Sequence, residues 1–207
     1  MYEGVEVEVS IGSKTPDMVG AISQYAGLCY GKDDKSVKRV RACYMVGHTG
    51  ILEHASVSFL VKGISRACSH QLVRHRMASY LQESQRYVKY DLSGDDWYVI
   101  PPSVEKNAYM LAEYNEKMAE DAKAYGDALA YGIKPEDARY LLPNAMKTNI
   151  VVTMNVRSLF HFFDLRLGRR AQWEIRELAV QMAMEMEKVE PALMSIYYEL
   201  YDKTRID

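Results

Sequence analysis

The chain has 207 residues, of which 48% are hydrophobic and 26% are charged; this composition is typical of a folded globular protein and excludes a disordered or collagen-like chain. No apolar run reaches the ~18 residues that a membrane span needs, and the first residues, MYEGVEVEVS, are unlike a signal peptide. The three cysteines form no CxxC pair, which suits a reducing compartment. We therefore expect one cytoplasmic domain over residues 1–207, with no membrane partner.

Hydrophobic periodicity predicts strands and helices without regular strand–helix alternation, which indicates an α+β fold with a helix-rich shell. Alternating apolar residues mark the strands, and capping residues and glycines mark the helix ends. The first expected elements are a strand over Val5–Ile11, a helix that Thr15 caps and that runs to Tyr30, and a helix from Lys35 to Val46 that stops at Gly47. A strand over 55–62, a helix from its N-cap Ser65 to Arg76 and a strand over 97–100 that ends at Pro101 follow. The remaining elements are a helix from Val104 to Tyr131 that stops at Gly132, a short helix from Pro135, a strand over 148–155, and helices over 157–167, 172–189 and 191–203.

The net charge of −2 conceals two basic regions. Residues 62–89 hold six Lys or Arg against Glu83, and residues 157–176 hold five Arg against Asp164 and Glu174. Basic regions within an acidic protein indicate a local anion site rather than a surface that binds nucleic acid, so no nucleic-acid partner is expected. A solvated basic helix face is the alternative that charge alone leaves open.

Several familiar motifs are absent. No GxGxxG follows a strand and no GxSxG is present, so neither a Rossmann dinucleotide site nor a serine hydrolase is indicated. The run from Gly27 to Lys32 is one residue too short for a P-loop, and Asp33 stands where a magnesium-binding Ser or Thr belongs. His48, Glu53 and His54 form no HExxH frame, so structural roles are favoured for them and no metal is expected.

The most informative segment is RHRMASYLQESQRYVKY, residues 74–90. Its first three residues, Arg-His-Arg, are expected at the end of a helix, and guanidinium groups there can bind phosphate bidentately and stay charged. The alternative is that these cations only complement the helix dipole. Ser84 and Arg86 stand two apart, so in an extended segment they would share a face and form a second site for an oxyanion.

The run Arg-His-Arg at 74–76, followed after seven residues by Ser84 and then by Arg-Tyr at 86–87, resembles the signature of the flavin-dependent thymidylate synthases, the ThyX family. The segments VGHTGILEHASVSFLVK, WYVIPPS, ARYLLPNA, VVTMNVRSL and AQWEIRELA also resemble family segments, in the same order and over most of the chain. The resemblance implies an α+β fold with an antiparallel-rich central sheet, and a homotetramer whose sites are shared between subunits. It also implies reductive methylation of dUMP to dTMP, with 5,10-methylenetetrahydrofolate as carbon donor and NADPH as reductant through bound FAD.

The resemblance assigns most of the candidate site residues. Those implied to contact FAD are Gly50, Arg74, His75, Arg76, Gln82, Asn155, Val156, Arg157 and His161. Those implied to line the dUMP pocket are Gln71, Leu72, Val73, Arg74, Gln82, Glu83, Ser84, Gln85, Arg86, Asn149 and Arg166. His48 and Glu53 match residues on the flavin or folate side, and a hydrogen-bonded structural pair is the alternative for them. Ser84 is expected to bind rather than to attack, because no general base stands beside it in the sequence.

Arg166 is the one residue that the resemblance implies to be catalytic, because it matches an arginine that polarises the uracil ring. A fixed cation beside N3 stabilises negative charge on the ring, which makes C5 a better carbon nucleophile. Without the resemblance, an ion pair of Arg166 with Asp164 or Glu174 would be the simpler expectation.

Three positions depart from the family pattern. Asn149 stands where many relatives have a basic residue that contacts dUMP, a contact that Lys147 could supply instead. Arg170 replaces a flavin-stacking histidine, and Gly50 replaces a hydroxyl residue near the flavin phosphates. Two other functions therefore stay open: a nucleotide- or RNA-binding protein without catalysis, and a flavoprotein of the same fold that oxidises NADPH without methylating dUMP.

Overall fold

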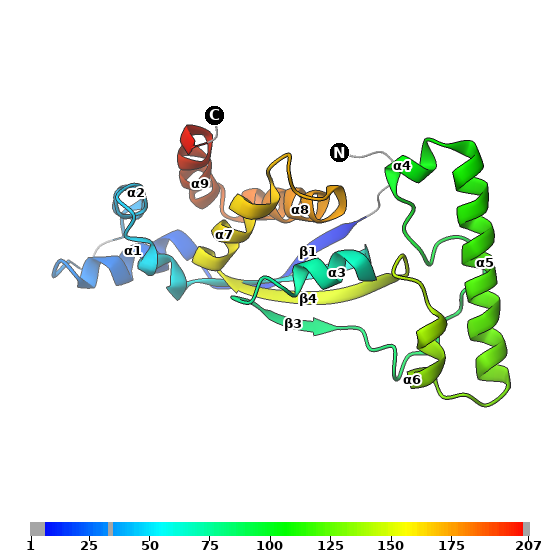
Figure 1. Cartoon of the computed structure of the whole chain (residues 1–207). Coiled ribbons are helices and arrows are strands. Elements are labelled where there is room, and N and C mark those ends of the chain that lie inside the picture. The colour runs from blue at the N-terminus through cyan, green and yellow to red at the C-terminus, as the bar shows by residue number, and fades with distance from the viewer. Residues whose placement is uncertain (1–6, 33–34, 205–207) are drawn as a thin grey trace.

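The computed structural model describes residues 7–32 and 35–204 and has the predicted α+β fold. In this part of the chain the strands form one antiparallel sheet in the order β1-β2-β4-β3 (Figure 1), so the antiparallel-rich sheet that the resemblance implies is confirmed. The strands are β1 (Glu8–Lys14), β2 (Ser56–Ser65), β3 (Ser79–Gln82) and β4 (Lys147–Asn155). The central pair, β2 and β4, joins segments almost one hundred residues apart in the sequence, as in the pairing of Phe59 with Val152.

The helices lie over one face of the sheet and at its two ends. They are α1 (Met18–Leu28), α2 (Val37–Met45), α3 (Arg66–Leu72), α4 (Pro102–Glu105), α5 (Ala108–Ala130), α6 (Pro135–Ala138), α7 (Val156–Arg166), α8 (Trp173–Val189) and α9 (Pro191–Thr204), with 3₁₀ helices η1 (Thr49–His54) and η2 (Arg139–Leu141). Figure 1 shows α3, α7 and α8 over the sheet, α1 and α2 at one end, and the long α5 at the other. No helix within residues 7–32 and 35–204 is both long and apolar enough to span a membrane.

The hydrophobic core lies between the sheet and the helices that cover it. Side chains alternate along β2, so Phe59 and Val61 are buried while Leu60 points to the opposite face and is 41% exposed. Leu81 on β3 is 74% exposed. In the described chain, no helix covers this second face (Figure 1).

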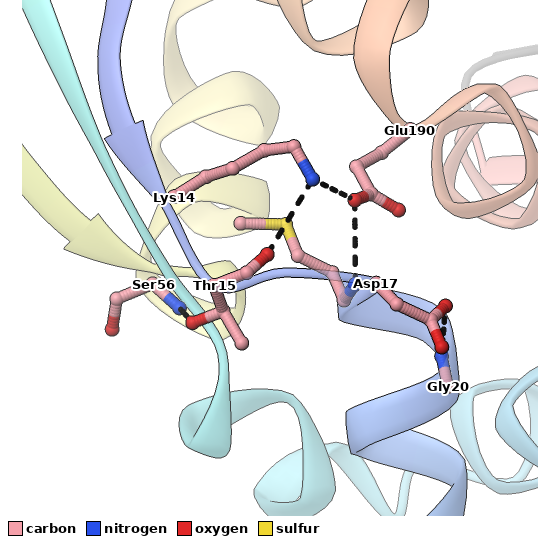
Figure 2. Close-up of polar contacts among 7 residues, drawn as sticks. Lys14, Thr15, Asp17, Gly20, Ser56 and Glu190 are labelled. Carbon is pink, nitrogen blue, oxygen red and sulfur yellow. Dashed lines mark hydrogen bonds and ion pairs between the residues drawn. The ribbon is translucent and has the colours of Figure 1, made fainter.

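Glu190 holds the junction between β1 and α1 (Figure 2). Its buried carboxylate accepts hydrogen bonds from Lys14 Nζ at 2.6 Å and from the first amide of α1 at 3.3 Å. The prediction that Thr15 caps this helix is wrong. The Thr15 hydroxyl instead accepts from the Ser56 amide at 3.0 Å, and Asp17, with φ of 45°, caps the helix. The Thr15 hydroxyl therefore binds the first residue of β2 instead of an amide at the start of α1.

Other helix ends follow the sequence prediction. Ser65 caps α3 by accepting a hydrogen bond from the Cys68 amide at 2.9 Å. Gly47 and Gly132 follow the ends of α2 and α5 with φ of 81° and 82°, a conformation that favours glycine. Ser65 is itself held by Glu174 of α8, whose carboxylate accepts from both the Ser65 amide and the Ser65 hydroxyl at 2.6 Å.

The helix that begins at Arg66 ends at Leu72, earlier than the predicted end at Arg76. The segment 73–78 then joins α3 to β3, a strand that hydrophobic alternation does not predict because this part of the chain is polar and tyrosine-rich. β3 is stabilised by pairing with β4, from Ser79 opposite Thr153 to Gln82 opposite Ile150. Tertiary pairing therefore decides the structure of this segment.

The predicted strand over residues 97–100 is also wrong. It makes only the isolated bridge between Tyr98 and Met146 within the described chain. Pro101 has no amide hydrogen to extend the pairing, and the facing chain turns away where the Met146 amide donates to the Pro143 carbonyl at 3.1 Å.

Two predicted elements have different limits. The helix expected from Val104 to Tyr131 is interrupted after α4, because Asn107 caps a new helix, α5, by accepting from the Met110 amide at 3.1 Å. Val5, at the start of the first predicted strand, lies outside the described residues. The observed β1 continues to Lys14, past the predicted end.

Candidate functional site

A cavity of about 520 Å³ lies at the start of α7. Its lining comes from η1, the segment after α3, the end of β4 and α7, and consists of Thr49, Glu53, Met77, Asn155, Arg157, Ser158, Phe160, His161 and Asp164. Asn155 ends β4 and caps α7, with its Oδ1 accepting from the Ser158 amide at 2.9 Å. Arg157 and His161 stand one turn apart on α7 and both reach the cavity. A volume of this size suits a small-molecule ligand.

An ion pair between Arg157 and Glu53 links α7 to η1 beside the cavity. Both side chains are about half exposed, and exposed pairs of this kind contribute little to stability. Arg157 can therefore exchange Glu53 for an anionic ligand at small cost. The alternative pairing of Glu53 with His48 is not among the contacts of the described residues, and His48 does not line the cavity.

The Arg-His-Arg run occupies the segment between α3 and β3. Arg74 and Arg76 are exposed, and neither has a hydrogen-bonding or ion-pair partner for its side chain in the described part of the chain. His75 between them points inward: it is 8% exposed, and its Nε2 lies 3.1 Å from the Ser158 carbonyl oxygen. A carbonyl oxygen can only accept, so Nε2 carries the proton. The two arginines are thus available to an anion, while the histidine anchors the segment to α7.

The burial of His75 predicts a pH dependence of stability. Burial lowers the pKa of His75 below its usual 6.5, and the nearby His161 and Arg166 act in the same direction. A lowered histidine pKa adds stability above pH 6.5, and this stability is lost as the pH falls through the folded-state pKa, because the unfolded chain binds the proton more tightly. We expect the urea midpoint of the wild-type protein to fall with acidification more than that of His75→Phe, whose ring cannot titrate. Unfolding curves between about pH 5 and about pH 8 measure this, and equal pH dependence in the two proteins would contradict it.

Arg166 lies in the last turn of α7. Its Nε is buried and has no hydrogen-bonding partner among the described residues. The ion pairs considered from the sequence are not formed: Glu174 instead accepts from Ser65, and Asp164 accepts from the Tyr197 hydroxyl at 3.0 Å. An unpaired buried donor is costly, so a ligand that accepts from Arg166 would remove that cost.

A second group of candidate residues lies at the other end of β3 and β4. Gln82 Nε2 donates to Ser69 Oγ at 3.0 Å and to Thr148 Oγ1 at 3.2 Å. Asn149 Nδ2 donates to Glu83 Oε2 at 2.6 Å. Gln82, Glu83 and Asn149 also line a cavity of about 340 Å³. These bonds form two sets on opposite faces of the sheet, because Thr148 is buried and the next residue, Asn149, is exposed. The two sets together are the second group.

Ser84 and Arg86 do not share a face of an extended segment, so that prediction is wrong. The chain turns here, because the Tyr87 and Val88 amides both donate to the Ser84 carbonyl, at 3.3 and 3.1 Å. The Ser84 hydroxyl accepts from the Arg86 amide at 3.3 Å. The Arg86 guanidinium pairs with Glu136 at 3.2 Å, unlike the unpaired Arg74 and Arg76.

Four residues considered from the sequence are restricted in what they can offer a ligand, and two of them, Leu72 and Val156, can offer only their backbone. The side chains of Leu72 and Val156 are fully buried in the core. The Gln85 amide lies against Met146 Sδ at 3.1 Å. Lys147 is paired with Asp96, which is almost fully exposed, so a nucleotide that used Lys147 in place of a basic residue at position 149 would have to displace this carboxylate.

Comparison with known proteins shows the family of this chain. The family model described as thymidylate synthase complementing protein matches residues 11–192. The flavin-dependent thymidylate synthase of Geobacter sulfurreducens is 43% identical over 199 residues, which cover 90% of this chain and 85% of that protein. The chain belongs to the flavin-dependent thymidylate synthase family.

Other relatives and a solved structure extend the comparison. The flavin-dependent thymidylate synthase of Pyrococcus furiosus is 51% identical over 143 residues, 69% of this chain, and the match spans 59% of that protein's length. The crystal structure of the UMP/dUMP methylase PolB from Streptomyces cacaoi, bound with 5-Br dUMP, is 22% identical. It matches 94% of this chain and 95% of its own with a TM-score of 0.83, so the two share a fold.

The signature of the flavin-dependent thymidylate synthases is therefore divided between two places in this chain. Residues 74–76 lie near the 520 Å³ cavity, and Ser84 and Arg86 lie with the second group. Gly50 and Arg170 are exposed and line neither cavity. The described residues contain no group of three or more His, Cys, Asp or Glu that could hold a metal ion.

Several residues of these two groups were not assigned from the sequence. They are Thr49, Ser69, Met77, Tyr80, Tyr90, Thr148, Ser158 and Phe160. Burial raises the pKa of the Tyr90 hydroxyl, and its hydrogen bond to Glu83 adds to this effect. Most are small or apolar residues that carry no chemical signal by themselves. The contact of η1 with α7 brings together those around the larger cavity, and the pairing of β3 with β4 brings together those of the second group.

Proposed function

We propose that this protein catalyses the reductive methylation of dUMP to dTMP, with 5,10-methylenetetrahydrofolate as carbon donor and NADPH as reductant through bound FAD. The observation that carries the proposal is a set of guanidinium nitrogens that have no hydrogen-bonding partner among the described residues, those of Arg74 and Arg76 and the Nε of Arg166. They lie on the two segments, residues 73–78 and α7, that also contribute Met77 and Arg157 to the lining of the 520 Å³ cavity. Guanidinium groups that no carboxylate neutralises are suited to phosphate and to a polarised ring carbonyl. Family membership supports the same reaction.

The residues around the larger cavity fit a flavin nucleotide. Arg74, Arg76 and Arg157 would hold its phosphates, and Asn155 and His161 would contact the ring system. Bound FAD, once reduced by NADPH, would supply a hydride for the methylation. Residues of this chain would orient the cofactor and keep water from it. The ion pair of Arg157 with Glu53 supports the fit, since both side chains are about half exposed and an anionic ligand can replace Glu53 at small cost.

Arg166 would act on the pyrimidine. Its guanidinium, held at the end of α7, would donate to the uracil carbonyl next to N3 and stabilise negative charge on the ring. The ring charge makes C5 more nucleophilic, and the partial burial of Arg166 strengthens the interaction, because less water screens it. Gln82, Glu83 and Ser84 would bind the nucleotide, and the protein would need no nucleophile of its own.

We further propose a homotetramer with sites shared between subunits. Asn155 and Asn149 stand at opposite parts of β4, ~20 Å apart at the rise of an extended strand. A single chain therefore keeps the implied FAD residues at the start of α7 away from the implied dUMP residues at positions 83–86 and 149. Subunits that bring the cavity of one copy to the second group of another would complete the site. The uncovered sheet face offers apolar side chains such as Leu60 and Leu81 for such contacts.

Ser84→Ala tests whether Ser84 only binds. The Ser84 hydroxyl contacts the Arg86 amide and no histidine or carboxylate in the described chain, so nothing there would remove its proton. We expect the variant to retain measurable dTMP formation with a raised KM for dUMP, by about tenfold for one lost hydrogen bond. Steady-state kinetics and dUMP calorimetry measure both quantities. Complete loss of turnover with unchanged dUMP binding would instead assign Ser84 a covalent role.

Two measurements test the proposed function. A visible absorption scan of the purified protein should show bound flavin, and the spectrum should change when dUMP is added. Tritium should be released from C5-labelled dUMP under anaerobic conditions when folate and NADPH are present. NADPH oxidation without tritium release would favour the flavoprotein that does not methylate dUMP. That alternative arises because Asn149 stands where many relatives have a basic residue. A colourless protein whose polynucleotide binding falls steeply with salt would favour the non-catalytic alternative.

A further inference from the structure

Tyr80 contacts the segment that carries both unpaired arginines. It lies on β3, and its hydroxyl oxygen is 2.8 Å from the Leu72 carbonyl oxygen and 2.7 Å from the His75 carbonyl oxygen. A phenol has one proton, so the Leu72 and His75 carbonyl oxygens share it, and both are held next to the Tyr80 hydroxyl. Burial raises the pKa of Tyr80 to about 12, so the hydroxyl remains a donor at any working pH. The end of α3 and the residue between the two arginines are thus tied to β3.

A second contact holds the same segment from the other side. The His75 ring packs on α7 with Nε2 3.1 Å from the Ser158 carbonyl oxygen, and its centroid lies 5.6 Å from that of His161. Tyr80 binds the backbone of His75 while α7 binds its side chain. Met77, two residues further on, lines the 520 Å³ cavity. The segment is therefore clamped between β3 and α7 where it forms part of the cavity wall.

We propose that Tyr80 is a positioning residue, whose hydroxyl fixes residues 73–77 so that Arg74 and Arg76 face the anionic groups of FAD and dUMP. This inference rests on the proposed function. Long arginine side chains lose conformational freedom when they bind, and a backbone held in advance lowers that loss. Without the hydroxyl, two carbonyls lose a donor and the segment can adopt other conformations. Ligand affinity would fall although neither ligand touches Tyr80.

Tyr80→Phe removes the clamp, and Tyr114→Phe is a matched control. Tyr114 lies on α5, is similarly buried, and its hydroxyl donates to a single backbone carbonyl, that of Val99, at 2.8 Å. Both variants delete one hydroxyl and should lose similar thermal stability. Only Tyr80→Phe should weaken FAD and dUMP binding, by about five- to tenfold, measured by flavin titration and calorimetry. Amide hydrogen exchange in residues 73–78 should also accelerate only in Tyr80→Phe.

The two variants separate positioning from general stability. Equal losses of ligand affinity in Tyr80→Phe and Tyr114→Phe, or unchanged affinity in Tyr80→Phe, would overturn the inference. If the wild-type protein bound neither FAD nor dUMP, the proposed function would fail, and the exchange measurement would still decide whether Tyr80 orders the segment. Unchanged exchange of residues 73–78 in Tyr80→Phe would then overturn the positioning role as well.

Discussion

Arg166→Ala should lower dTMP formation about 100- to 1000-fold, the range found when one preorganised donor to a developing negative charge is removed. FAD should remain bound, because Arg166 lies in the last turn of α7, does not line the cavity and is not among the residues proposed to hold the cofactor. The loss should appear in kcat rather than in KM for dUMP, since the interaction strengthens as charge develops on the ring. Tritium release from C5-labelled dUMP measures the step, and the flavin absorbance of the same sample reports cofactor content.

Two further variants sharpen this result. Arg166→Lys keeps the charge but not the planar fork, so an intermediate rate is expected. Arg169→Ala removes an exposed cation from the turn that follows α7 and should leave turnover unchanged. Wild-type turnover in Arg166→Ala would refute the catalytic role. Loss of the flavin spectrum together with turnover would assign Arg166 to cofactor binding instead.

Glu174→Ala should destabilise the protein by about 2–4 kcal/mol, the effect of leaving buried donors without an acceptor. Glu174 is 2% exposed and accepts two hydrogen bonds of 2.6 Å from Ser65, which caps α3. Its removal therefore weakens the contact between α8 and the start of the helix that leads to the Arg-His-Arg run. Urea denaturation at neutral pH measures the change in the free energy of unfolding.

Controls for this prediction lie on the same helix. Glu187→Ala replaces an exposed carboxylate of α8 and should change stability by less than about 0.5 kcal/mol. Burial raises the pKa of Glu174, so a neutral isostere is tolerated better than truncation, and Glu174→Gln should lose clearly less stability than Glu174→Ala. Equal stability of Glu174→Ala and Glu187→Ala would contradict the role assigned to the buried carboxylate.

Local sequence patterns predicted the elements in which apolar residues recur regularly over the whole length of the strand or helix. Alternation identified β2 and β4, and amphipathic spacing identified α7 and α8 close to their observed limits. The predicted helix start at Ser65 and the predicted helix stop at Gly132 were correct, because a capping side chain or a left-handed glycine acts on residues only a few positions away. Arg157 and His161 reach one cavity because helical spacing alone puts them on the same face.

Predictions failed where a distant segment competes with a local preference. Thr15 was expected to cap a helix, but Ser56, forty-one residues away, uses its hydroxyl. The helix expected to reach Arg76 stops at Leu72, where the Tyr80 hydroxyl and the pairing of β3 hold the chain in another direction. Sequence spacing carries no information on contacts of this kind.

The order of residue types along the chain determined the family signature, the central strands and the basic regions, because each depends on neighbours within a few positions. Tertiary structure alone decided that His75 is buried between two exposed arginines, that Arg166 keeps an unpaired Nε, and that the signature is divided between two ends of β4. Each of these features arises where strands and helices distant in sequence compete for the same hydrogen bonds and the same buried volume.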